Sequence, residues 1–136
     1  RTIDHASGWH DQRIGGIQSL HVYFLTYRFH PDRLGRAVVL SEFGGYQLPV
    51  AGHTWGTRSF GYHGCRTPEA LGEAVRSLYE KQILPAARGG LAASVYTQLS
   101  DVENEVNGLV SYDRKVVKLP ETLLREISLE LRASRK

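Results

Sequence analysis

The stretch that decides the fold is AVVLSEFGG, residues 37–45, an apolar β-branched run that ends in Glu42 and two glycines. Two similar runs, QSLHVYF (18–24) and LAASVYTQL (91–99), also follow glycines. Their near-continuous apolar character is typical of strands covered on both faces, as in a parallel sheet. A shorter segment, TID (2–4), is a further candidate strand at the amino end.

Two helices are predicted around the third run. In TPEALGEAVRSLYEKQIL (67–84), Thr67 is a good N-cap, Pro68 suits the first helical position, and apolar residues recur at helical spacing. Pro85 should kink or end this helix, with 86–88 as a last turn. The closing segment PETLLREISLELRA (120–133) places Leu123, Leu124, Ile127 and Leu131 on one stripe. Strand, helix, strand and helix in this order predict an α/β fold.

Composition narrows the function classes. The chain has 136 residues, a formal net charge of +3, and no apolar stretch approaching the roughly 20 residues that span a bilayer. Much of the positive charge lies in the terminal RASRK, so neither a nucleic acid nor a membrane is an expected partner. The single Cys65 forms no internal disulfide, and the histidines near it lack metal-ligand spacing, which favours a surface loop over a metal site. The chain contains no Met and begins at Arg1, which suggests a fragment.

Polar and aromatic groups follow each candidate strand. Parallel α/β folds bind ligands at the carboxyl ends of their strands, so these groups should gather at one edge. His21 and Tyr23 lie two apart and should point to the same side. Each residue also has a structural explanation: an aromatic can be packing, an acidic loop can be solvated, and Glu42 can belong to a buried ion pair. The candidates are Trp9, His21, Tyr23, Glu42, Tyr96, Gln98, Asp101 and Asn107.

Together these side chains point to carbohydrate chemistry. Sugars need flat apolar surfaces for stacking and many directional hydrogen bonds. Retaining glycoside hydrolysis needs two carboxyl groups about 5 to 5.5 Å apart, one as nucleophile and one as acid and base. Glu42 can be one of them, whereas Asp101 and Glu103 lie in a loop-like segment and make no convincing second.

The motifs LSEFGG, ASGW, HVY and GGLAASVYTQLSDVENEVNGLVSYDRK resemble the C-terminal half of the catalytic barrel of glycoside hydrolase family 2, which includes β-galactosidases, β-glucuronidases and β-mannosidases. The resemblance covers roughly residues 1–118. It implies that residues 1–136 are about strands five to eight of a (β/α)8 TIM barrel. The expected partners are the other half-barrel and the β-sandwich domains of a larger chain. A half-barrel also exposes strand edges, so the isolated chain is expected to self-associate.

The resemblance also implies roles for residues. Glu42 matches the nucleophile, Tyr23 the tyrosine beside it, and His21 a neighbouring sugar contact. Tyr96 stands where many members have a tryptophan; Trp9 and Asn107 match less firmly. The remaining expected substrate contacts are Trp55, Gln98 and Asp101.

The family's acid/base Glu would lie upstream of residue 1, so the isolated chain is expected to be inactive. The uronidase subgroup has an Asn-x-Lys pair where this chain has Glu105, Val106 and Asn107, so a neutral glycoside is the expected substrate. No organic cofactor is implied. The rival interpretation is a non-catalytic carbohydrate-binding or scaffold segment.

Overall fold

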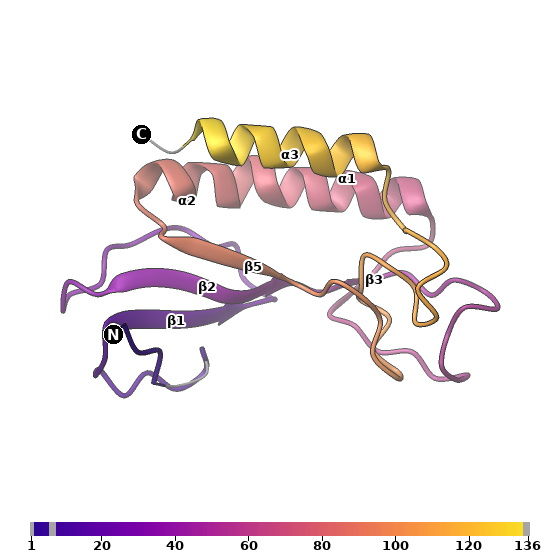
Figure 1. Ribbon diagram of the computed structural model, residues 1–136, viewed down its shortest axis with the longest axis horizontal. Helices are drawn as coiled ribbons and strands as arrows, with labels where there is room; N and C mark the ends of the chain where they lie inside the picture. Colours follow the sequence, from indigo (N-terminus) through magenta and orange to yellow (C-terminus); the bar gives the residue numbers. More distant parts are fainter. Residues whose placement is uncertain (1, 6–7, 135–136) are drawn as a thin grey trace.

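A computed structural model describes residues 2–5 and 8–134. Its centre is an open three-stranded parallel sheet in the order β1-β2-β5, in which β1 is Ile17–Val22, β2 is Ala37–Gly44 and β5 is Ala93–Thr97 (Figure 1). A second, two-stranded parallel pair joins β3 (Tyr46–Gln47) to β4 (His63–Gly64). The helices are α1 (Pro68–Leu78), the π turn η1 (Tyr79–Ile83), α2 (Leu84–Gly89) and α3 (Glu121–Ala133).

The predicted α/β class and the three central strands are confirmed. The predicted strand at TID is wrong, because the described residues 2–5 form no strand. This segment nevertheless runs beside β1: Gly16 N–H donates to the Ile3 carbonyl (3.2 Å), and His21 N–H donates to the Gly8 carbonyl (3.4 Å). The amino-terminal segment therefore flanks the outer edge of β1 without completing a ladder.

The predicted long helix is present and continues through Pro85. Thr67 caps it as expected, because its side-chain oxygen accepts from the Ala70 N–H at 3.1 Å. Five residues of π-helix, η1, directly precede α2, whose first turn contains Pro85. The wider π turn accommodates a proline ring that would clash with the preceding carbonyl in a regular helix. Gly90, with a φ of 114°, then ends the helix in the left-handed conformation.

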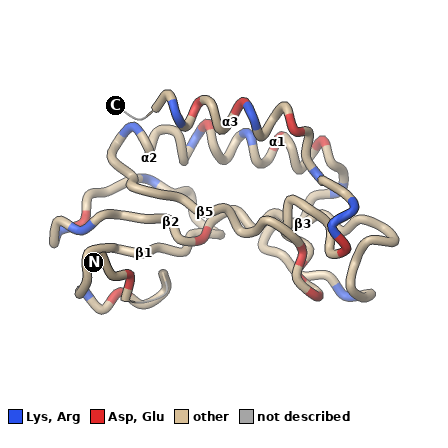
Figure 2. The backbone as a smooth tube through the Cα atoms, viewed as in Figure 1, with Lys and Arg blue, Asp and Glu red and all other residues tan. Residues whose placement is uncertain are grey.

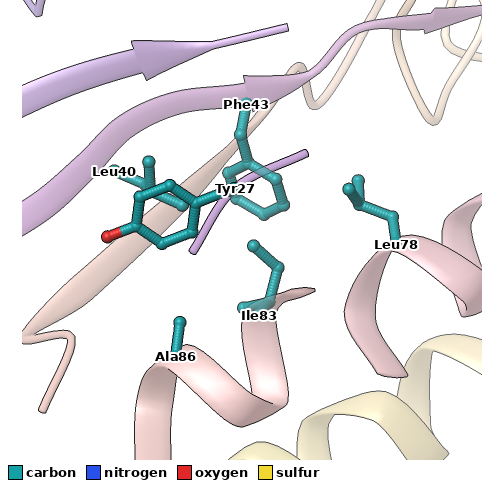
Figure 3. Close-up of a cluster of buried hydrophobic side chains, with 6 residues drawn as sticks. All are labelled: Tyr27, Leu40, Phe43, Leu78, Ile83 and Ala86. Carbon is teal, nitrogen blue, oxygen red and sulfur yellow. The ribbon is translucent and has the colours of Figure 1, made fainter. Parts of the chain in front are cut away.

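The core lies between one face of the sheet and the helices. Leu40 and Phe43 from β2 pack against Leu78, Ile83 and Ala86 from the helical segment, and Tyr27 closes this cluster from the connection after β1 (Figure 3). A second cluster joins α1 to α3; it contains Leu48, Leu71, Val75, Leu119 and Ile127. The predicted stripe on α3 is confirmed, because its leucines pack on this second cluster.

All helices lie on the same side of the sheet, as Figure 1 shows. Figure 2 shows acidic and basic residues interleaved along the chain of α1 and α3. Within the described residues, no helix combines the length and apolarity needed to cross a bilayer. The opposite face of the sheet is therefore the one on which polar groups from several strands can meet.

Candidate functional site

The orientation of Glu42 depends on a β-bulge in β2. His21 pairs with Glu42 and Leu20 pairs with Leu40, so β2 carries one extra residue at Ser41, and the register against β5 shifts at the same place. The bulge lets Leu40 and Phe43, three residues apart, both face the helices. Glu42 is thereby directed to the open face, which is a common use of a bulge beside a functional site.

The Glu42 carboxylate is held from β1. Tyr23 Oη donates to Glu42 Oε2 at 2.7 Å, and His21 Nδ1 lies 3.2 Å from the same oxygen. The Glu42 side chain keeps 43% of its surface exposed, whereas that of His21 keeps 8%. The predicted common side of His21 and Tyr23 is confirmed. Glu42 is thus an accessible carboxylate that one largely buried donor, Tyr23, holds by a hydrogen bond, with the His21 ring close beside it.

Two residues that the sequence did not single out complete this group. Thr97 Oγ1, at the end of β5, lies 3.0 Å from Tyr23 Oη. Because the single proton of Tyr23 is donated to Glu42, the Thr97 hydroxyl donates in this second bond. Tyr62 stacks on Tyr23, with ring centroids 3.7 Å apart and an interplanar angle of 8°. Burial raises the pKa of Tyr23, and the hydrogen bond to Glu42 adds to the rise. Tyr23 therefore stays protonated at neutral pH and acts as a donor to Glu42.

Trp9 borders the same group. Its ring lies 5.4 Å from the His21 ring, edge to face, and 6.2 Å from the Tyr23 ring, and 55% of its surface is exposed. Gly8 allows this approach, because a Cβ there would lie 2.3 Å from the His21 side chain. An exposed aromatic face beside an anchored carboxylate can stack on a sugar ring.

The glycine pair after Glu42 makes room for two tyrosine rings at the end of β2. Gly44 and Gly45 have φ values of 89° and 68°, in the left-handed region that glycine adopts without strain. A Cβ on Gly45 would lie 2.4 Å from the Tyr62 ring, and one on Gly44 would lie 2.3 Å from the Tyr96 ring. Only glycine lets these two rings come so close to the end of β2.

Two predicted sugar platforms lie elsewhere. Tyr96 faces the helices, where its ring packs edge to face on Phe43 at 5.7 Å; its neighbour Thr97 is the residue of β5 that reaches the Glu42 group. Trp55 is 58% exposed and packs beside Tyr112, with centroids 5.1 Å apart. The structure therefore does not bring Tyr96 to Glu42, and it gives Trp55 a neighbour in a different loop.

The loop after β5 contains a separate polar cluster. Gln98 Nε2 donates to Glu105 Oε2 at 3.0 Å and to the side-chain oxygen of the buried Asn107 at 2.7 Å. Burial raises the pKa of Tyr62 most, and the charges of Glu105 and then Glu42 raise it further. Tyr62 thus lies within electrostatic reach of both carboxylates and links this cluster to the Glu42 group.

Asp101 is in a different environment from the one expected. It is fully buried and bonded to Lys118 Nζ at 2.7 Å and to the Gly108 N–H at 2.8 Å. Lys118 Nζ also donates to the Val106 carbonyl at 2.9 Å. These bonds fold the loop 98–110 onto the segment before α3, which gives Asp101 a structural partner instead of an open face.

Among the described residues, no three His, Cys, Asp or Glu side chains converge as metal ligands would. Burial raises the pKa of the Cys65 thiol, so it is mainly protonated at neutral pH. A scan against models of protein families finds no match to the chain, and a search of curated proteins finds no significant match. Any functional assignment therefore rests on the residues and their geometry.

Proposed function

We propose that the chain is the C-terminal half of the catalytic barrel of a retaining β-glycosidase that resembles glycoside hydrolase family 2 and acts on neutral glycosides, with Glu42 as the nucleophile. The observation that carries the proposal is the accessible Glu42 carboxylate at the end of β2, held by Tyr23 at 2.7 Å and His21 at 3.2 Å. A nucleophile must be fixed in direction and open to substrate, and this carboxylate meets both requirements.

The chemistry takes two steps. Glu42 attacks the anomeric carbon, a carbon–oxygen bond forms to the enzyme, and the glycosidic bond breaks as the leaving oxygen takes a proton from a second carboxylic acid. That group, now a carboxylate, removes a proton from water, which cleaves the glycosyl ester and releases Glu42. Tyr23 donates to Glu42 Oε2, which leaves Oε1 as the oxygen for attack. The second carboxylic acid is expected from the part of the barrel outside these residues.

The fold supports a barrel segment over a doubly wound sheet. The strands follow one another in chain order without reversal, and the helices cover a single face (Figure 1). A doubly wound sheet reverses its strand order and carries helices on both faces. In the described sheet β5 pairs only with β2, so its other edge is free. Val95 in this strand is 56% exposed. The free edge of β5 is where the next strand of a closed barrel would pair.

The charges around the site favour an uncharged sugar. Glu105 and Glu42 both act on Tyr62, so the surroundings are already negative. A sugar carboxylate placed there would be repelled unless a cation faced it. The residues before Gly108 are Glu105, Val106 and Asn107, which supply no such cation. Galactosides, mannosides and other neutral glycosides fit this distribution.

Trapping the covalent intermediate tests the proposal. The intact protein is incubated with 2-deoxy-2-fluoro glycosides that carry a good leaving group, and the labelled peptide is mapped by mass spectrometry. We expect the label on Glu42, and no label in Glu42→Gln. Glu103→Gln is the matched control and should label normally, because Glu103 lies in the exposed loop after β5. A label on any peptide without Glu42 would refute the assignment.

The exposed Trp9 favours a second candidate, a non-catalytic carbohydrate-binding segment. In that case Glu42 accepts hydrogen bonds from a sugar but forms no covalent bond to its anomeric carbon. The same experiment separates the two functions: a binding segment would bind neutral glycosides, release no aglycone and carry no label.

A further inference from the structure

A cavity of about 540 Å³ lies beside β1, away from the Glu42 group. Parallel strands are usually joined by a crossover helix, but the connection 23–36 between β1 and β2 contains none. The cavity is lined by Leu20 from β1 and by the segment 27–34 of this connection. Its volume is in the range of small-molecule sites, so the missing helix leaves a space large enough for a ligand.

Tyr27 lines this cavity, and its hydroxyl is enclosed without a partner in the described part of the chain. Tyr27 is 9% exposed, and no described residue forms a hydrogen bond with its Oη. Its N–H donates to Gln82 Oε1 at 2.7 Å, which fixes its backbone. Figure 3 shows the hydroxyl directed away from Phe43 and Leu78, past Leu40. Burial raises the pKa of Tyr27, so the group is a hydrogen-bond donor at neutral pH. The cavity therefore meets the side of the Tyr27 ring, and its hydroxyl is out of reach of a ligand in the cavity.

One wall of the cavity is an ion cluster of one arginine and two aspartates, which keeps a net negative charge. The guanidinium of Arg36 bonds both oxygens of Asp11, at 2.7 Å each, and both oxygens of Asp32, at 3.0 Å each. Its remaining N–H donates to the Ile14 carbonyl at 3.4 Å. Arg36 therefore has no donor left for a ligand. Its positive charge offsets part of the negative charge of the two carboxylates.

The other basic residues at the cavity are not committed. Arg13, Arg28 and Arg33 line it and are exposed, and no described carboxylate forms an ion pair with them. Together with Arg36 they outnumber the two aspartates of the lining by two charges. Leu20 and Leu34 supply apolar surface to the same space. The lining thus combines an excess of positive charge with an apolar wall.

We propose that this cavity is a binding site for a small organic anion: an apolar ring system that packs on Leu20 and Leu34, with a carboxylate or phosphate head that meets the exposed arginines. The site does not depend on the proposed glycosidase function. None of the residues that contact Glu42 lines it.

Calorimetric titration of the intact protein tests the site with three probes: 2-naphthoate, the uncharged 2-naphthamide and acetate. We expect saturable binding of 2-naphthoate, binding of 2-naphthamide weaker by at least about tenfold because the charge is lost, and none of acetate because the ring is lost. Absence of saturable naphthoate binding would overturn the proposal. So would equal affinity for the acid and the amide.

Variants locate the binding. Tyr27→Phe keeps the packed ring and removes only the enclosed hydroxyl, so it should bind 2-naphthoate as the wild type does. The triple variant Arg13→Gln, Arg28→Gln, Arg33→Gln should weaken it by about tenfold or more and leave 2-naphthamide unchanged. The matched control carries glutamine at three exposed arginines outside the lining, Arg58, Arg66 and Arg88. If the triple variant binds 2-naphthoate as the control does, the probe binds elsewhere and the proposal is wrong.

Discussion

The buried pair of Asp101 and Lys118 gives the sharpest prediction about stability. The two side chains are 1% and 0% exposed, and the Nζ–Oδ1 distance is 2.7 Å. Lys118 also donates to the Val106 carbonyl at 2.9 Å, and Asp101 also accepts from the Gly108 N–H at 2.8 Å. Burial lowers the pKa of Lys118, and the attraction of Asp101 opposes this shift. Each charge is therefore tolerated in the interior because the other is present.

Removing either charge alone should lower the free energy of unfolding by several kcal/mol. Lys118→Met leaves the Asp101 carboxylate buried without a counter-charge, which typically costs about 3 to 5 kcal/mol. Asp101→Asn leaves Lys118 in the same position and should cost a similar amount. The double variant contains no buried charge, and its asparagine still accepts from Gly108. It should cost only about 1 kcal/mol, because the Val106 carbonyl loses the Lys118 donor but still accepts from the Leu48 N–H at 3.1 Å. The two substitutions should therefore be strongly non-additive.

Urea unfolding followed by tryptophan fluorescence measures these free energies. Lys115→Met is the matched control, because the Lys115 side chain is 74% exposed, and it should change stability by less than about 0.5 kcal/mol. Glycoside affinity is measured in parallel on the folded variants. If Asp101 contacts the sugar, as the sequence suggested, Asp101→Asn should weaken binding with little loss of stability, and the double variant should be additive. That result would refute the structural role.

Three further predictions concern other parts of the fold. Hydrogen bonds from Arg36 lower the pKa of Asp32 to about 2, so this carboxylate stabilises the fold above its ordinary pKa near 4 and loses that effect as the pH falls towards 2. Thermal unfolding by circular dichroism should show a steep loss over this interval in the wild type and a smaller one in Arg36→Met, whereas parallel losses would contradict the assignment. Phe43→Ala should lower the free energy of unfolding by about 3 to 5 kcal/mol, because the side chain is 2% exposed and central to the core, and a loss below about 1 kcal/mol in urea unfolding would be inconsistent with that position. The isolated 136-residue chain should self-associate through the free edge of β5, where Val95 and Leu99 are 56% and 76% exposed; a monodisperse monomer in light scattering would argue against this.

The sequence predicts the elements of this fold well where local signals are strong. Thr67 and Pro68 mark the helix start, and the apolar stripe of α3 follows a regular period. TID has the same local character as a strand, but residues 2–5 make too few bonds to β1 for one. Strand formation depends on a partner, and composition does not show whether the partner segment aligns. The π turn before Pro85 likewise depends on packing against the sheet.

The candidate site is predictable where it lies on a strand and less so where it lies on a loop. Alternation places His21 and Tyr23 on one side, and the structure agrees. The same rule, applied to β5, would have placed Thr97 opposite Tyr96 and identified it as the residue that faces Tyr23. Tyr62 follows no such rule, because it comes from the long connection 45–66. Only the tertiary fold stacks its ring on Tyr23.

The orientation of Glu42 is the feature of β2 that a rule of strict alternation predicts wrongly. Counting by twos along β2 from the buried Leu40 puts Glu42 on the helix side and Phe43 on the open side. The structure reverses this order, because the bulge at Ser41 inserts one residue relative to both neighbouring strands. Ser41 Oγ bonds Ser19 Oγ at 2.6 Å on the open face, which holds the bulge in place. Without the bulge, the carboxylate would enter an apolar layer at a cost of several kcal/mol, and Phe43 would face solvent. The stability of the core and the exposure of Glu42 therefore depend on the same extra residue.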